Sequence, residues 1–384
     1  MAKDKDLKTP NVPPLRFPGF SDEWVKVSLG DIGETLIGLT YSPKDVVAND
    51  GTIVFRSSNI QDGMIDYTDL VRVNKPIKER IVTRENDILI CARNGSQRLI
   101  GKNALLTKAD EGNTFGAFMM IYRSDDNDVI HPILSTRRYI SQVSENLGAR
   151  INQITTSDLN SFEFYIPSNC IERRKIGKLF ALINERIATQ NKIIEDLKKL
   201  KSAIRWKIFS DLKNHQTKTI EVGELLAYEQ PSPYIVTNDE YVSDSNKIPV
   251  LTANKGFILG YTDEPFGIYQ KGNCIIFDDF TMDAKYVTFP FKVKSSAIKI
   301  LTAKPSANLR FMFEYLQSLD LKSEEHKRHY ISEVAKMVVS MPSIDMQKNI
   351  ASILVSIDTK LMIERNLTNR YEEEKQYLLS NMFI

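Results

Sequence analysis

The sequence IASILVSIDTKL, at residues 350–361, repeats the pattern of IGKLFALINERI, at residues 176–187. The two stretches lie 174 residues apart, and each belongs to a long segment without proline that follows Pro167 or Pro342. Apolar residues recur in both segments at alternating steps of three and four, which is typical of helices that pack along one seam as a coiled coil. The sequence therefore predicts two matching long helices that pair with each other.

Each predicted helix has a seam of ten residues. The first seam consists of Ile176, Phe180, Ile183, Ile187, Gln190, Ile194, Leu197, Lys201, Ile204 and Ile208. The second consists of Ile350, Leu354, Ile357, Leu361, Glu364, Thr368, Tyr371, Lys375, Leu378 and Met382. Polar seam residues set the register of a coiled coil. We hypothesise an antiparallel pair in which Lys201 lies opposite Glu364 and, by symmetry, Gln190 lies opposite Lys375.

The segments between the helices also repeat, although more weakly. VSLGDI at residues 27–32 recurs as IEVGELL at 220–226, and ENDILI at 85–90 recurs as KGNCII at 271–276. Short β-rich runs separated by turns predict an α+β fold for both segments. The repeat indicates the order globular, helix, globular, helix. The predicted boundaries are a tail and lead-in at 1–24, a first domain at 25–165, a first helix at 166–213, a second domain at 214–338 and a second helix at 339–384.

Composition narrows the class of protein only a little. The 384 residues carry a net charge of +2, which neither requires nor excludes a nucleic-acid partner. Three cysteines without a CxxC pair indicate a reduced, cytosolic protein. No apolar run is long enough to span a bilayer, and the four histidines suggest no metal site. Phe17, Phe20 and Trp24 predict a lead-in that packs onto the first domain.

The sequence offers little sign of catalysis. It has no GxxxxGK[ST] loop for ATP, no glycine-rich strand–turn–helix and no Asn-Pro-Pro-Tyr segment for a methyl donor. Asp279, Asp283 and Lys285 are the nearest approach to a nuclease site, but such clusters are common by chance and the first repeat has no equivalent. We therefore predict a non-catalytic protein.

The whole layout resembles the specificity subunit of Type I restriction–modification systems. The resemblance is carried by PLRFPGFSDEW at 14–24, LGDI at 29–32, and the two proline-led helices that end in Phe209 and Phe383. It implies an α+β fold in which two similar target-recognition domains are separated by two long helices, paired as an antiparallel coiled coil with pseudo-two-fold symmetry. It also implies that these helices act as a spacer between the two DNA-reading domains.

The resemblance also implies the partners and the role. A subunit of this kind reads a bipartite, asymmetric site on double-stranded DNA and docks two methyltransferase subunits and, through them, restriction subunits. It binds no cofactor, whereas the partner subunits use S-adenosylmethionine, ATP and Mg, and it acts in the cytoplasm away from any membrane. Two alternatives are a solitary DNA-binding nuclease and a coiled-coil scaffold with no role on DNA.

Side chains suited to DNA contact gather in short polar segments of both domains. Arg, Asn and Gln read base edges, whereas Lys and Arg contact phosphates. In the first domain the candidates are Arg56, Ser57, Ser58, Asn59, Arg93, Asn94, Ser96, Gln97, Arg98, Lys102, Arg150, Asn152 and Gln153. In the second they are Thr252, Asn254, Lys255, Thr281, Lys285, Lys327, Arg328 and His329. Lys292, Lys294 and Lys299 form either a phosphate-binding stripe or an ordinary surface strand.

Overall fold

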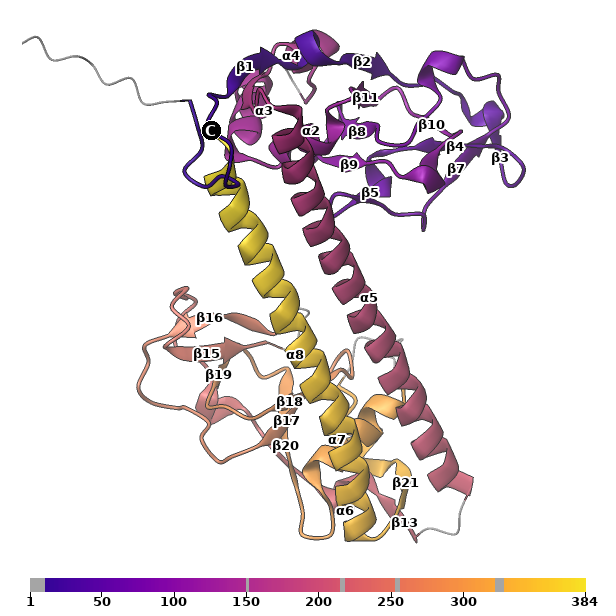
Figure 1. Cartoon of the computed structure of the whole chain (residues 1–384). Coiled ribbons are helices and arrows are strands. Elements are labelled where there is room, and N and C mark those ends of the chain that lie inside the picture. The colour runs from indigo at the N-terminus through magenta and orange to yellow at the C-terminus, as the bar shows by residue number, and fades with distance from the viewer. Residues whose placement is uncertain (1–10, 150–151, 215–217, 253–255, 322–327) are drawn as a thin grey trace, which may run out of the picture. The chain divides into compact units, whose positions relative to one another are not determined.

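The chain divides into two compact units, each with one globular domain and parts of two long helices. The computed structural model describes residues 11–149, 152–214, 218–252, 256–321 and 328–384. The first unit comprises Met1–Gln190 and Leu367–Ile384, and the second comprises Asn191–Asn366. The helices α5 (Cys170–Asn214) and α8 (Ile344–Met382) pass through both units (Figure 1). Each long helix is thus shared between the two units, and the predicted domain boundaries stay a prediction.

The first domain is built on two four-stranded sheets. One has the order β2 (Glu34–Ile37), β11 (Met119–Arg123), β8 (Ile88–Cys91), β9 (Asn103–Leu105). The other has the order β10 (Thr114–Phe115), β4 (Thr52–Phe55), β7 (Val71–Val73), β3 (Val46–Val47). All four residues of β8, Ile-Leu-Ile-Cys, are buried, as expected of a strand that is apolar on both faces.

Shorter elements complete this domain. Strand β1 (Val25–Ser28) pairs antiparallel with β12 (Glu163–Ile166), and β5 (Ile60–Gln61) pairs with β6 (Met64–Ile65). The helices are α1 (Leu29–Ile32), α2 (Asn127–Ile133), α3 (Arg137–Ala149) and α4 (Thr156–Asn160). Short 3₁₀ turns are η1 (Pro43–Asp45), η2 (Ser57–Asn59), η3 (Glu79–Ile81), η4 (Gln97–Leu99) and η5 (Lys108–Asp110).

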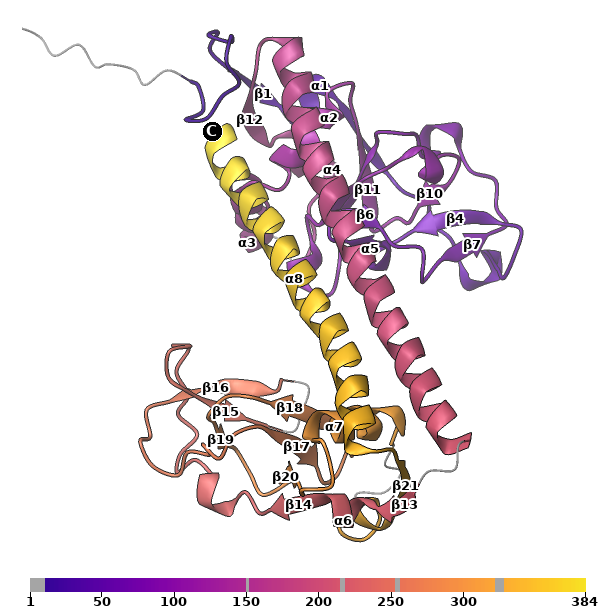
Figure 2. The same cartoon turned by 60° about the horizontal axis from the view of Figure 1, so that its bottom comes forward.

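The second domain repeats this topology. Its larger sheet has the order β14 (Leu226–Glu229), β20 (Ile298–Ala303), β17 (Cys274–Asp278), β18 (Ala284–Val287), and α7 (Leu309–Ser318) lies beside it (Figure 2). The smaller sheet has the order β16 (Ile258–Thr262), β15 (Ile248–Leu251), β19 (Lys292–Val293). Strand β13 (Lys218–Glu221) pairs with β21 (Val338–Met341), and the remaining elements are α6 (Val222–Leu225), η6 (Ser232–Tyr234) and η7 (Val334–Lys336).

The strand pairings confirm the sequence repeat. β2, β11, β8 and β9 correspond in order and direction to β14, β20, β17 and β18. In each smaller sheet one parallel pair, β4 with β10 or β15 with β19, stands beside an antiparallel neighbour. Both domains are α+β, as predicted.

The predicted helix seams are confirmed, because every seam residue is buried or half-buried. In the first unit Phe180 on α5 lies 5.6 Å, ring centre to ring centre, from Phe383 just beyond α8. In the second unit Phe209 near the end of α5 packs 5.4 Å from Phe311 and 4.8 Å from Tyr315, both on α7. Each domain core therefore takes in the beginning of one long helix and the end of the other.

The lead-in packs onto the first domain as predicted. The Arg16 guanidinium donates two hydrogen bonds to the buried carboxylate of Glu172, at 2.6 and 2.8 Å. Trp24 is buried and makes an edge-to-face contact with Phe383 at 6.1 Å. These contacts tie the segment before β1 to the ends of both long helices.

The predicted helix register is wrong. Lys201 Nζ lies 2.7 Å from Asp358, and Glu364 pairs instead with Lys360 on its own helix. Asp358 precedes Glu364 by six residues, which is roughly 9 Å along a helix. Lys375 likewise lines a pocket with Asn184, six residues before its expected neighbour Gln190. Both pairs are displaced by the same six residues.

The six-residue displacement of the register is explained by a residue outside the two seams. Glu314 on α7 is fully buried and accepts hydrogen bonds from Lys201 Nζ at 3.1 Å and from Arg205 at 2.9 Å. Arg310, one turn earlier on α7, contacts both Glu314 and Asp358. Lys201 thus pairs with two acids, Asp358 on α8 and Glu314 on α7. The seam pattern contains no information about α7.

We expect Glu314→Gln to lower the free energy of unfolding by about 3–5 kcal/mol, because it removes the acid that pairs with Arg205 and leaves Lys201 and Arg310 with Asp358 alone. Glu195→Gln is the matched control, since Glu195 forms an exposed pair with Lys198 on the same helix. That variant should lose no more than about 1 kcal/mol. Urea denaturation followed by circular dichroism measures both, and equal losses would contradict a structural role for the network.

A second buried ion pair stabilises the second domain. Lys292 Nζ is fully buried and lies 2.6 Å from the Glu264 carboxylate. The same carboxylate accepts hydrogen bonds from the backbone N–H and the hydroxyl of Thr237, at 2.9 and 2.6 Å. The Lys292 ammonium, followed by these Thr237 donors, lowers the pKa of Glu264 to about 2.

Because this pKa lies below the ordinary value of 4.5, the pair stabilises the fold fully above pH 4.5 and loses its effect as the pH falls towards 2. Glu264→Gln should therefore cost about 3 kcal/mol at neutral pH. The difference from the wild-type chain should shrink steadily below pH 4.5. Denaturant titrations across this range test it, with the exposed Asp263→Asn as control. A difference that does not change with pH would refute the assignment.

Candidate nucleic-acid interface

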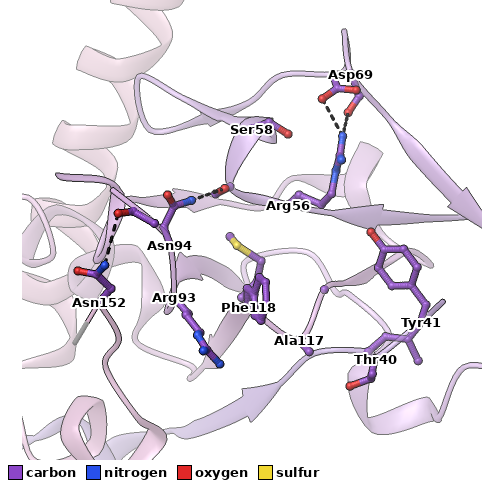
Figure 3. A pocket seen from close by; sticks show the side chains of 15 residues that line it. Thr40, Tyr41, Arg56, Ser58, Asp69, Arg93, Asn94, Ala117, Phe118 and Asn152 are labelled. Carbon is purple, nitrogen blue, oxygen red and sulfur yellow. Dashed lines mark hydrogen bonds and ion pairs between the residues drawn. The ribbon is translucent and has the colours of Figure 1, made fainter. Parts of the chain in front are cut away.

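Several polar connections of the first domain meet around one pocket of about 930 Å³. Arg56, Ser57 and Ser58 follow β4, and Arg93, Asn94 and Gly95 follow β8, while Asn152 precedes α4 (Figure 3). All of these except Gly95 are candidates predicted from three separate stretches of sequence. The structure brings them together because β4 and β8 both end at this side of the domain.

The connection after β8 emerges from the core as a closed loop. Cys91 donates its N–H to Lys102 O and accepts from Gly101 N, both at 2.8 Å. Gly101 has a φ of +82°, and a Cβ there would lie 3.1 Å from Val143. The loop between these anchors therefore needs glycine at this position, and it displays Arg93 through Arg98 outside the sheet.

Arg93 is the best placed side chain for contact with a ligand. Its guanidinium lies 5.3 Å from the ring centre of Phe118, whose side chain is 60% exposed at the pocket wall. Within the described residues Arg93 makes no ion pair. A guanidinium held over an aromatic face keeps its hydrogen-bond donors available to a partner.

Asn94 and Asn152 hold the loop in place. Asn94 donates to Ser57 Oγ at 3.0 Å and accepts from Ser96 N at 2.9 Å. Asn152 has a positive φ and donates to Gly95 O at 3.4 Å. These amides are already used within the protein, so they position the neighbouring side chains.

Arg56 also lines the pocket, and the neighbouring Asn59 holds its connection in place. Arg56 pairs with Asp69 at 2.7 Å. Asn59 is fully buried; its amide donates to the carbonyls of Asp66 and Asp69 and accepts from Arg56 N. The Asn59 side chain is therefore enclosed and its hydrogen bonds are used within the fold, and its predicted DNA contact stays a prediction.

The remaining candidates of the first domain lie further along the loop or beside it. Ser96, Gln97 and Arg98 are exposed, whereas Lys102 is half-buried and reaches Gln61 at 3.4 Å. Gln153 is half-buried, and its backbone forms a bridge with Arg93. Arg150 lies outside the described residues.

The sequence pattern does not indicate several other residues of this pocket, among them Phe118, Tyr41 and Asp69. Phe118 stands where the chain enters β11, and Tyr41 and Asp69 belong to other connections of the same domain. An exposed phenylalanine within GAFMMIYRS reads as part of a buried strand, so its type gives no signal. Asp69 lines the pocket as the partner of Arg56, and the sequence gives no sign that these two residues pair.

The corresponding segments of the second domain also meet. Tyr330 N donates to Asp279 Oδ1 and His329 N donates to Asp279 O, both at 2.9 Å. The turn after β17 thus contacts the segment that precedes β21, as the loop after β8 contacts Gln153. Arg328 is exposed and reaches Ser296 Oγ at 3.5 Å.

The other candidates of this domain divide into exposed and enclosed residues. Thr281 is exposed, Thr252 is half-buried, and Lys285 pairs with Asp283 at 2.7 Å. His329 is buried beside Glu333, and its predicted DNA contact stays a prediction. Asn254, Lys255 and Lys327 lie outside the described residues.

The proposed lysine stripe is not a surface feature. Lys292 and Lys299 are buried, the first against Glu264 and the second 3.3 Å from Asp279. Lys294 pairs with Asp239. Because Asp279 is also buried and engaged, it is not available as a nuclease ligand. No cluster of three His, Cys, Asp or Glu suited to a metal occurs among the described residues.

Along the described parts of the chain, no helix combines the length and the apolar character needed to cross a bilayer.

Relatives and solved structures agree with this architecture. The EcoR124I/EcoR124II specificity subunit of Escherichia coli, a type I restriction enzyme component, is 37% identical over 182 residues, 43% of this chain and 45% of that protein. The chain thus aligns with less than half the length of that relative. The putative MjaX specificity subunit of Methanocaldococcus jannaschii is 25% identical over 398 residues, 94% of this chain and 92% of that protein.

The fold is also that of a solved S subunit. The crystal structure of the Type-I restriction-modification system S subunit from M. genitalium has a TM-score of 0.67 at 17% identity and covers 97% of this chain and 99% of that one. The family model for the Type I restriction modification DNA specificity domain matches twice, at residues 21–199 and 214–373. With two tandem matches of this kind, the chain belongs to the Type I restriction modification DNA specificity family.

Proposed function

We propose that this chain is the subunit that reads a bipartite, asymmetric target on double-stranded DNA, one half-site with each domain. The observation that carries the proposal is the pocket of the first domain, where Arg93, Ser58 and Phe118 stand at one opening. Loops held by a rigid scaffold are the usual place for such recognition.

The pocket has the chemistry of base recognition. An arginine guanidinium can donate two hydrogen bonds to guanine O6 and N7, and a serine hydroxyl can donate or accept. Phe118 offers an apolar face beside Arg93. Because Asn94, Asn152 and the Arg56–Asp69 pair fix the surrounding backbone, the reading groups are held in place before DNA binds.

Phosphate contacts fall to cations at the edges of the two domains, some exposed and one, Lys102, half-buried. In the first domain the candidates are Arg98 and Lys102. In the second domain the candidate is Arg328, which is exposed, as is Thr281. The two domains differ in detail, since the β5–β6 hairpin belongs to the first domain. Unequal readers suit an asymmetric target.

The chain works, we propose, with two methyltransferase subunits and, through them, restriction subunits. Its relatives are named specificity subunits, and one solved structure concerns complex assembly of a type I system. Exposed apolar side chains on the long helices give such partners a surface. These side chains are Leu182, Ile193, Leu200 and Trp206 on α5, and Ile353, Met362, Ile363 and Tyr377 on α8.

In this scheme the chain itself performs no catalysis and holds no cofactor. S-adenosylmethionine, ATP and Mg belong to the partner subunits, and the complex acts on DNA in the cytoplasm.

Selection of bound duplexes from a random pool tests the proposal. The full chain should enrich two short motifs at a fixed spacing. Replacing residues 25–154 with the corresponding part of another specificity subunit should change one motif and leave the other. A change in both motifs, or in neither, would contradict a division of the target between domains.

Arg93→Ala should lower affinity for the selected duplex by about 1–3 kcal/mol and relax the preference at one base pair. Arg174→Ala, at an exposed position on α5, is the control and should retain that preference. Binding titrations with single-base variants of the selected duplex measure both. A uniform loss of affinity across all the duplexes would make Arg93 a phosphate contact instead.

A further inference from the structure

A second pocket, of about 440 Å³, lies in the first unit between the β8–β9 loop, α2, α3 and the two long helices. Its lining includes Arg98, Lys102, His131, Asn184 and Lys375. Three cations therefore line one hollow, with Asp62 as the acidic residue among the lining side chains.

Lys375 lacks the partners that its equivalent has in the second unit. By the 174-residue repeat Lys375 corresponds to Lys201, and Asn184 corresponds to Asp358. Lys201 is held by Asp358 and by Glu314. At the first copy the acid is replaced by the neutral Asn184, and within the described residues Lys375 forms no ion pair. The pocket thus has positive charge that the fold itself does not balance.

His131 is a second polar group without a partner in this pocket. Its side chain is only 8% exposed, and it makes no side-chain hydrogen bond within the described residues. Burial, helped by the charge of Lys375, lowers the pKa of His131 to about 4, so the ring is neutral at pH 7. A neutral imidazole has one N–H to donate. A buried donor beside unbalanced cations is suited to an anion.

We propose that this pocket binds a phosphate group, and that the backbone of bound DNA supplies it. Lys375, Lys102 and Arg98 provide the charge, while His131 and Asn184 provide neutral hydrogen-bond donors. The inference rests on the proposed function for the source of the phosphate.

The loop after β8 favours DNA as that source. Arg93, Asn94 and Gly95 line the base-reading pocket, and Gln97 through Lys102 line this one. A single loop thus contributes to both, so a duplex read at the first pocket passes its sugar–phosphate chain along the same loop. Phosphate contacts of this kind fix the orientation of a protein on DNA.

Imidazole NMR of the full chain tests the site directly, because the chain has four histidines and His131→Gln assigns the signal. A duplex of mixed sequence should shift the His131 signal, and Lys375→Gln should abolish that shift. Lys178→Gln, an exposed change on α5 outside this pocket, should retain it. A shift with inorganic phosphate but not with duplex would overturn DNA as the source. A shift with a polyglutamate peptide but not with duplex would assign the pocket to an acidic protein partner.

The salt dependence of binding to the selected duplex gives a second readout. Lys375→Gln should reduce the slope of log affinity against log salt by about 1, while the Lys178→Gln slope stays at the wild-type value. Base preference should be unchanged. A wild-type slope for Lys375→Gln, with a motif still selected, would overturn this inference and leave the proposed function standing. If no motif is selected but the duplex still shifts His131, base reading fails and the phosphate site stands.

Discussion

Each domain core includes the end of a long helix that starts beside the other domain: the first core takes in the end of α8, and the second takes in the end of α5. Phe383, Met382 and Leu379 are buried among the strands and helices of the first domain, beside Phe180 at the start of α5. Phe209 and Leu212 occupy the same position in the second, beside Leu354. Burial of large apolar side chains is the main favourable term in folding, so neither core is complete without both helices. The lead-in also packs against these helix ends, through the contact of Trp24 with Phe383.

Periodicity was enough to predict the helices but not their register. A step of three and four locates the seam on each helix from local sequence alone, and every seam residue is indeed buried or half-buried. The register depended on pairing Lys201 with an acid of the other seam. Glu314 comes from α7, a different element, and its approach to Lys201 is a tertiary contact that no spacing rule contains.

Much the same limit applies to the candidate site. Arg93 and Ser58 were predictable because polar residues follow a buried strand, and such residues gather at the ends of strands. Asn59, His329 and Lys292 are polar or charged as well, yet each is enclosed and bonded within the fold. Residue type indicates what a side chain can do, whereas burial decides whether it is available. Phe118 illustrates the converse, an aromatic residue left exposed where its strand begins.

The burial of the end of α8 in the first-domain core also affects folding during translation. The strands of the first domain leave the ribosome early, but part of the apolar layer that covers them, at residues 379–383, is translated only after the second domain. Domains usually fold in the order of their synthesis. Here part of the first-domain core stays exposed until α8 has been translated. During that interval the nascent chain presents an apolar surface to which chaperones bind.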